Sequence, residues 1–192
     1  SYPKQFSNLI GESSLFQQSA LRLIDSKQVQ FTNHLVLTNT DYRFIVGEQL
    51  QSVGIDPGPI LIEPSSKNTA AAILAATIYA LESDDDAILL VAPSDHIMPD
   101  VDALHSSIQI AITQVLKGKI VTFGVEAVSP DTGYGYIELS NSLDKISPVA
   151  NFIEKPDREI ALNMLAKENY VWNAGIFMFR AKDMLEAFKT HC

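Results

Sequence analysis

The feature that most restricts the fold of this sequence is an alternation of short apolar runs with longer helical patterns. Four runs have the length of a strand: "HLVLT" (34–38), "PILIE" (59–63), "AILLVA" (87–92) and "KIVTFGV" (119–125). Helical patterns occupy 41–54, 68–82 and 101–118. Strands that are apolar throughout are typical of sheets covered on both faces, and regular strand–helix alternation favours parallel pairing. The first 125 residues therefore predict a doubly wound, mainly parallel α/β sheet with helices on both faces.

The pattern changes after residue 125. "TGYGYIEL" (132–139) and "ISPVANFIEKP" (146–156) indicate two strands close together, "DREIALNMLAKEN" a helix, "NAGIFMFR" a strand and "AKDMLEAFKTH" another helix. This order predicts a smaller mixed or antiparallel portion added to the first. Because no Gly/Ser-rich linker or internal repeat divides the chain, we expect one domain over 1–192, made of the portions 1–125 and 126–192.

Composition excludes several classes of protein. The 192 residues include one cysteine, Cys192, so a disulfide framework within the chain is excluded and a cytoplasmic location is expected. No apolar stretch reaches the roughly 20 residues needed to cross a bilayer, and the N-terminus lacks the pattern of a signal peptide. The formal net charge of −9, without a run of Lys or Arg, argues against nucleic acid as a partner. A phosphate ligand would have to be attracted locally, by a metal ion or by lysines.

Ligands of open α/β sheets bind beyond the carboxyl ends of the strands, so polar residues at those ends are the candidates for function. Asp95 follows "AILLVAP" directly, and a carboxylate in this position suits Mg²⁺, which binds through one or two carboxylates and the phosphates of a substrate. The alternative interpretations make Asp95 a loop-to-helix cap and His96 a packed histidine.

Glu63 ends a buried strand, and Asn68 and Thr69 open an alanine-rich helix. A carboxylate accepts two hydrogen bonds at once, which suits the adjacent N1–H and N2 amine of guanine. Small side chains at the start of the helix leave room for a flat ring beside free backbone N–H groups. The alternative is a strand-end acid beside a capped helix that packs on the sheet.

The second portion contains two more candidate segments. "TGYGYIEL" contains Gly135, where a ligand can approach the backbone closely; its alternative is a tight turn or bulge. In "FIEKPD", Glu154 can accept hydrogen bonds from sugar hydroxyls, and Lys155 is a point charge suited to phosphate. The alternative here is a solvated ion pair before a helix. Asn173 precedes the apolar run "AGIFMF" at the same predicted edge of the sheet.

Six segments carry a resemblance to a known family. They are "YPKQF", "IEPSSKNTAAAILAA", "LVAPSDHI", "TGYGYI", "FIEKPD" and "WNAGIFMF". In this order and at these spacings, nearly the whole chain resembles the bacterial mannose-1-phosphate guanylyltransferases. The resemblance implies a Rossmann-like nucleotidyltransferase fold, GTP and mannose 1-phosphate as substrates, GDP-mannose and pyrophosphate as products, and Mg²⁺ as cofactor.

The resemblance also implies the role of each matching residue in the nucleotide-binding half, 1–125. Lys4 contacts the phosphates of GTP, and Asp95 holds the Mg²⁺. Glu63, Asn68 and Thr69 lie at the guanine.

For the sugar-phosphate-binding half, 126–192, the resemblance implies that Gly135 meets the sugar through its backbone. Glu154 and Asn173 bond mannose hydroxyls, and Lys155 holds the phosphate of mannose 1-phosphate. Lys4, Asp95 and Lys155 are the expected catalytic residues.

Two departures from the family accompany the resemblance. Its glycine-rich loop with a Thr-Arg pair, and the first strand of its sheet, are expected ahead of "PKQF", where only Ser1 and Tyr2 stand. A second metal-binding aspartate is expected beyond Cys192. We therefore expect the domain to be incomplete at both ends. The alternatives for function are another sugar-1-phosphate nucleotidyltransferase and a non-catalytic nucleotide-sugar-binding regulatory protein, and a homo-oligomer is possible in either case.

Overall fold

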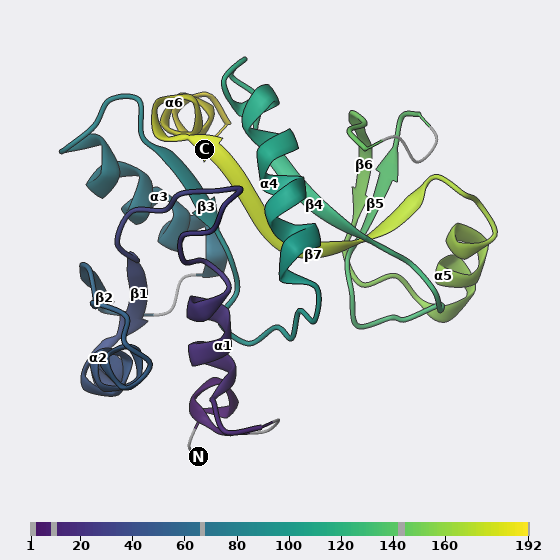
Figure 1. Ribbon diagram of the computed structural model, residues 1–192. Helices are drawn as coiled ribbons and strands as arrows, with labels where there is room; N and C mark the ends of the chain where they lie inside the picture. Colours follow the sequence, from purple (N-terminus) through teal and green to yellow (C-terminus); the bar gives the residue numbers. More distant parts are fainter. Residues whose placement is uncertain (1–2, 9–10, 66–67, 142–144, 192) are drawn as a thin grey trace.

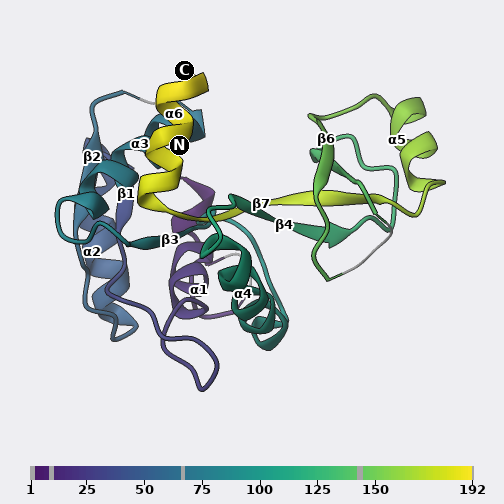
Figure 2. The same cartoon turned by 90° about the horizontal axis from the view of Figure 1, so that it is seen from above.

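In the computed structural model, which describes residues 3–8, 11–65, 68–141 and 145–191, the chain forms a larger and a smaller lobe (Figure 1). Seen from above, the smaller lobe stands apart and is joined to the rest by strands β4 (Val121–Glu126) and β7 (Tyr170–Arg180) (Figure 2). Because β7 continues from the smaller lobe into the larger one, the division of the chain into the portions 1–125 and 126–192 stays a prediction.

The strands of the described residues form two sheets. β1 (Val36–Asn39) pairs in parallel with β2 (Ile60–Glu63). In the second sheet, β7 is the central strand: β3 (Ile88–Val91), β4 and β5 (Tyr136–Leu139) all pair with it in antiparallel fashion, and β6 (Val149–Ile153) pairs with β5.

The prediction of a mixed α/β fold with a parallel sheet is confirmed, but the pairing of the strands is more antiparallel than the apolar runs indicated. In the described part of the chain, β1 with β2 is the parallel pair, and the other pairs are antiparallel. β3 and β4 run in the same direction, because both are antiparallel to β7. An apolar run indicates that a strand is covered on both faces, but it does not identify the strand that pairs with it.

The helices predicted from the sequence are present within a few residues of the expected bounds. They are α2 (Arg43–Ser52), α3 (Asn68–Leu81), α4 (Val101–Val115), α5 (Arg158–Leu165) and α6 (Ala181–His191). The side chain of Asp100 accepts a hydrogen bond from the Ala103 amide and so caps α4. Gly54 and Gly118 follow α2 and α4 with φ of 75° and 81°, the left-handed conformation that commonly ends a helix.

One helix was not predicted. α1 (Leu15–Leu21) begins with a capping box in which the Ser14 side chain accepts from the Gln17 amide and the Gln17 side chain accepts from the Ser14 amide. The pattern Ser-x-x-Gln is a known signature of a helix start and could have identified α1.

Two short 3-10 helices, η1 (Lys4–Phe6) and η2 (Thr40–Tyr42), complete the elements described. Phe6 of η1 is buried, with its ring edge-on to Phe16 of α1 and 5.4 Å from the ring of Tyr42. These contacts anchor the turn that contains Lys4.

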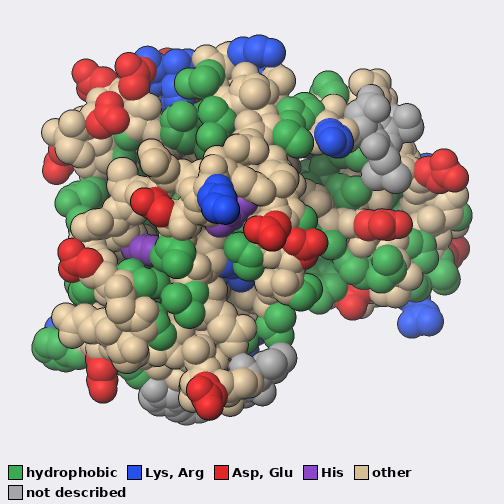
Figure 3. Space-filling view, viewed as in Figure 1, with side chains coloured by type: hydrophobic (Ala, Val, Ile, Leu, Met, Phe, Trp, Pro, Cys, Tyr) green, Lys and Arg blue, Asp and Glu red, His purple; other side chains and the backbone are tan. Residues whose placement is uncertain are grey.

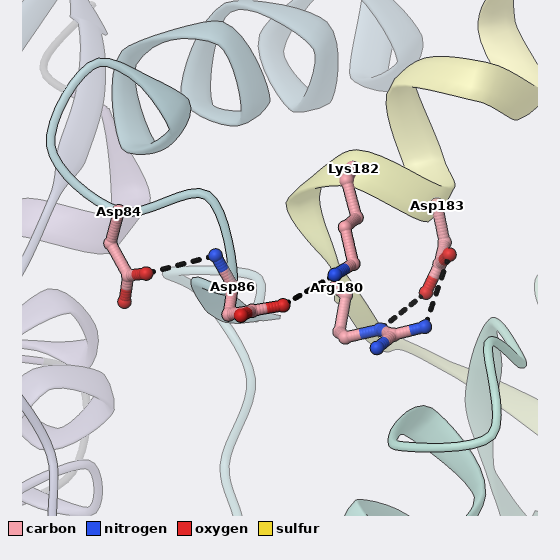
Figure 4. A network of polar contacts seen from close by, with 5 residues as sticks. All are labelled: Asp84, Asp86, Arg180, Lys182 and Asp183. Atoms are coloured by element: carbon pink, nitrogen blue, oxygen red, sulfur yellow. Dashed lines mark hydrogen bonds and ion pairs between the residues drawn. The ribbon is translucent and has the colours of Figure 1, made fainter.

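Polar contacts surround the start of β3 and the junction of β7 with α6 (Figure 4). Arg180 donates two hydrogen bonds to the carboxylate of Asp183, and Lys182 pairs with Asp86. The Asp86 amide donates in turn to the carboxylate of Asp84. The Lys182–Asp86 pair thus joins the segment before β3 to α6, at the end of β3 opposite the Asp95 loop.

Acidic side chains are spread over both lobes on the face shown in Figure 3, and no continuous field of Lys and Arg is present on that face. Among the described residues, no helix combines the length and the apolar character that crossing a bilayer requires.

Candidate active site

A cavity of about 1810 Å³ brings together predicted residues from both portions of the chain. Its lining includes residues of β2, the start of α3, the loop before β5, the segment directly after β6 and the middle of β7. The predicted site residues in its lining are Glu63, Asn68, Thr69, Gly135, Glu154, Lys155 and Asn173. Ser94 and His96, the two neighbours of Asp95, line it as well.

Part of the cavity is apolar and lies between the two sheets. Leu37 of β1, Leu90 of β3, Ile73 of α3 and Phe177 of β7 belong to its lining. Within the described residues, β1 pairs only with β2, and β3 pairs only with β7. The polar candidates therefore border an apolar interior.

Asp95 lies in the loop that follows β3. Its carboxylate is about one-third exposed and is 2.9 Å from the Lys4 ammonium, although 91 positions separate the two residues in the chain. The hydrogen bond to Asp95, and then its charge, raise the pKa of Lys4. Because Asp100 caps α4, the alternative interpretation of Asp95 as the cap of that helix is wrong. The alternative interpretation of His96 as a packed histidine is also wrong, since its side chain is 42% exposed and lies 3.8 Å from Asp95.

Arg22, which follows α1, is a further polar residue at this loop and was not predicted from the sequence. Its guanidinium is buried and donates to the carbonyl oxygens of Pro93 and His96, on either side of Asp95. The available signal was an arginine within the otherwise apolar segment "ALRLI" (20–24), and that signal indicates no particular partner.

Gly135 and Glu154 meet at the other end of the cavity. A Cβ atom added at Gly135 would lie 2.9 Å from Oε2 of Glu154, so the absence of a side chain permits this approach. The predicted tight turn is present two residues earlier, where the Gly133 amide donates to the Asp131 carboxylate.

Asn173 is oriented by three hydrogen bonds. Its backbone amide donates to the carbonyl oxygen of Gly135, and its side-chain oxygen accepts from the Thr122 hydroxyl and the Gly175 amide. No hydrogen bond from its side-chain NH₂ group to a described residue is found, so this donor is free for a ligand.

Two predicted site residues have an unusual backbone conformation. Lys155 has φ of 43° and Asn68 has φ of 62°, and they are the non-glycine residues with positive φ in the described ranges. Such a conformation costs about 1–3 kcal/mol and tends to occur at functional sites. The Lys155 ammonium is 3.5 Å from the Glu154 carboxylate, and both side chains are mostly exposed. The predicted solvated ion pair is therefore present, and both groups remain accessible to a ligand.

Glu63 is the last residue of β2 and lies opposite Asn39 of β1 in the parallel register. It is half-buried and faces the same cavity as Asn68 and Thr69 at the start of α3. This arrangement fits recognition of a base by Glu63. It equally fits the alternative, in which Glu63 is an acidic residue at the end of a strand and binds no ligand.

A site built from strand ends, with a loop carboxylate paired to a lysine, is typical of α/β proteins that bind phosphorylated ligands. The chain belongs to the nucleotidyl transferase family, whose model, described as "Nucleotidyl transferase", matches residues 1–191. It is 42% identical over 190 residues, 98% of its length, to the mannose-1-phosphate guanylyltransferase of Sinorhizobium fredii, of which it covers 37%.

Two further comparisons agree with this family. The chain is 42% identical over 189 residues to the xanthan biosynthesis protein XanB of Xanthomonas campestris pv. campestris, covering 98% of its own length and 40% of that protein. A crystal structure named as mannose-6-phosphate isomerase from Helicobacter pylori matches with a TM-score of 0.83 and 36% identity, over 100% of this chain and 71% of that one. The chain thus spans about 40% of the length of the curated relatives it matches.

Proposed function

We propose that this protein transfers GMP from GTP to mannose 1-phosphate, giving GDP-mannose and pyrophosphate. The observation that carries the proposal is that two groups of predicted residues line the same cavity. Glu63 and the start of α3 line one side, and Gly135, Glu154 and Asn173 line the other. The similarity to the guanylyltransferase of Sinorhizobium fredii supports the choice of substrates.

At the nucleotide end, Glu63 accepts the two adjacent donors of guanine, and Asn68 and Thr69 lie along the ring. The exposed residues at the start of α3 support this role, because they leave that edge of the cavity open. Adenine presents no such pair of donors, so the carboxylate favours GTP over ATP.

The phosphates lie between Lys4 and Lys155. Asp95 would hold a hard divalent cation through its partly exposed carboxylate, and the Lys4 ammonium, now 2.9 Å from that carboxylate, would turn to the phosphates. In the described parts of the chain, no three His, Cys, Asp or Glu side chains are grouped as metal ligands. Mg²⁺ generally binds proteins through one or two carboxylates, with water and the phosphates of a substrate as its other ligands. When bound there, Mg²⁺ neutralises charge on the triphosphate.

The sugar lies against the backbone of Gly135, with its hydroxyls bonded by the Glu154 carboxylate and the free NH₂ group of Asn173. Lys155 holds the phosphate of mannose 1-phosphate. The exposure of Glu154 and Lys155 supports this assignment, since an incoming ligand can reach both groups.

In the proposed reaction, a phosphate oxygen of mannose 1-phosphate attacks the α-phosphorus of GTP in line with the leaving pyrophosphate. One O–Pα bond forms and the bond from Pα to the bridging oxygen breaks, so no covalent enzyme intermediate is needed. Lys4 and Lys155 position the phosphates and offset their charge, which is the main requirement of phosphoryl transfer. A cytoplasmic location, with its supply of GTP, is part of this proposal.

The test is pyrophosphate release by the full-length protein with Mg²⁺ and mannose 1-phosphate, comparing GTP, ATP, UTP and dTTP. Release with GTP alone is the expected result. Release with another nucleotide would keep the enzyme class but contradict the assignment of Glu63. A folded protein that binds GDP-mannose but releases no pyrophosphate would support a regulatory protein instead. The possible homo-oligomer stays a prediction, which light scattering of the same sample tests.

A further inference from the structure

Arg22 is a buried cation at the base of the loop that contains Asp95. It is 4% exposed, and its Nη1 and Nη2 atoms donate to the carbonyl oxygens of His96 at 2.7 Å and Pro93 at 3.0 Å. The planar guanidinium presents its donors in a fixed fork. One side chain therefore holds both ends of the four-residue segment Pro93–His96.

No stabilising ion pair explains the burial of this charge. Among the residues that the structure describes, no carboxylate lies within 4.0 Å of Arg22, and its Nε atom is buried without a partner. Burial lowers the pKa of the guanidinium, while the charge of Asp95 opposes that effect. A buried charge without a paired charge is strongly unfavourable, and two hydrogen bonds to carbonyl oxygens offset only part of that cost.

The backbone of Arg22 is bonded in turn by a side chain of α4. His105, which is also buried, bonds the carbonyl oxygen of Arg22 through Nε2 at 2.8 Å, and its Nδ1 lies 2.9 Å from the Ser26 hydroxyl. Because a carbonyl can only accept, Nε2 of His105 donates this hydrogen bond. The backbone from which the guanidinium extends therefore has a defined place.

The loop is confined on its other side by β7. A Cβ atom at Gly175 would lie 3.2 Å from the ring of Pro93 and 3.8 Å from His96. The loop thus lies between Arg22 and β7, with the Asp95 carboxylate directed toward Lys4.

We propose that Arg22 is a positioning residue. Its fork fixes the two ends of the Pro93–His96 loop and so holds the Asp95 carboxylate where the triphosphate and its cation meet Lys4. The catalytic part of this inference rests on the proposed function, whereas the holding of the loop does not.

Three variants of the full-length protein test the proposal. Arg22→Met removes both the fork and the charge, and Arg22→Lys keeps the charge but replaces the rigid fork. The matched control is Arg43→Met, because Arg43 also donates to a backbone carbonyl, that of Thr40 in η2, but is exposed and does not bond the Pro93–His96 loop.

The first readout is hydrogen exchange of the amides at 94–97 without substrate, which does not depend on the proposed function. We expect exchange about tenfold faster in Arg22→Met, an intermediate rate in Arg22→Lys and no change in Arg43→Met, with β5 and β6 unaffected in all three. Unchanged exchange at 94–97 in a folded Arg22→Met variant would overturn the proposal. If Arg22→Met does not fold, the amide exchange rate at 94–97 in Arg22→Lys tests the proposal. A wild-type exchange rate in that variant would overturn the proposal.

The second readout is the steady-state kinetics of pyrophosphate release. We expect kcat to fall at least about tenfold in Arg22→Met and the Mg²⁺ concentration for half-maximal rate to rise, with partial recovery in Arg22→Lys. The KM for mannose 1-phosphate should stay within about twofold, because the sugar is bound from other elements. A parallel loss of sugar affinity and thermal stability would indicate a general structural role and contradict positioning. Absence of pyrophosphate release from the wild type would overturn the proposed function, while hydrogen exchange would still decide whether Arg22 holds the loop.

Discussion

Replacing Gly135 with alanine tests the sugar end of the cavity most directly. The added Cβ would lie 2.9 Å from Oε2 of Glu154 and 3.4 Å from the ring of Phe152. The contact to Phe152 is tolerable, but the contact to Glu154 is too short, so one group must move. Because the Glu154 side chain is 62% exposed, it can rotate away at little cost.

The expected consequence is a loss of sugar affinity in a protein of nearly unchanged stability. Gly135 does not have a positive φ, so alanine introduces no backbone strain. The ion pair of Glu154 with Lys155 lies between exposed groups and contributes at most about 1 kcal/mol. A hydrogen bond from a sugar hydroxyl to a carboxylate contributes about 1.5–3 kcal/mol, which corresponds to a rise in the KM for mannose 1-phosphate of roughly ten- to a hundredfold.

The assay is pyrophosphate release at saturating GTP with mannose 1-phosphate as the varied substrate, accompanied by a thermal melt. Gly47→Ala is the matched control: Gly47 lies inside α2 with nothing near its Cβ position, so alanine should raise stability by about 0.5–1 kcal/mol and leave the KM unchanged. An unchanged KM for mannose 1-phosphate in Gly135→Ala would refute the placement of the sugar against Gly135 and Glu154.

Three further predictions concern the nucleotide, the metal and the sheet. Glu63→Gln should reduce the preference for GTP over ATP, measured as the ratio of kcat/KM values, because the amide presents one acceptor and one clashing donor to guanine; an unchanged ratio would place base recognition elsewhere. Asp95→Asn should abolish Mg²⁺-dependent turnover and leave the circular dichroism spectrum intact, whereas unaltered Mg²⁺ dependence would assign the metal to other ligands. Gly124→Ala should destabilise the protein by about 1–3 kcal/mol in urea unfolding, since its Cβ would lie 2.4 Å from the Val171 side chain. Adding Val171→Ala should restore part of the lost stability. A wild-type unfolding midpoint in the single variant would contradict this packing.

Sequence reasoning located most elements because their signals are local. Apolar runs placed β1 to β4, and helical patterns placed α2 to α4, since each depends on residues within a turn or two. The candidate residues could be grouped for a similar reason: strand ends of an α/β sheet open to one side, and five of the residues chosen on that basis line one cavity, together with Asn68 and Thr69 from the start of a helix. Their individual roles remain to be tested by the substitutions above.

The tertiary structure alone decided which distant segments meet. The central position of β7, which pairs with β3, β4 and β5, was not evident from its sequence, because an apolar run can pair with any other.

The same holds for the polar contacts of the site. The ion pair of Lys4 with Asp95, and the two hydrogen bonds by which Arg22 holds the ends of the Pro93–His96 loop, join residues more than seventy positions apart. The amino-acid sequence by itself thus determined where strands, helices and reactive side chains occur, because those depend on local periodicity and chemistry. Only the folded chain determined which of these side chains face one another, because hydrogen bonds and ion pairs depend on distances that packing alone sets.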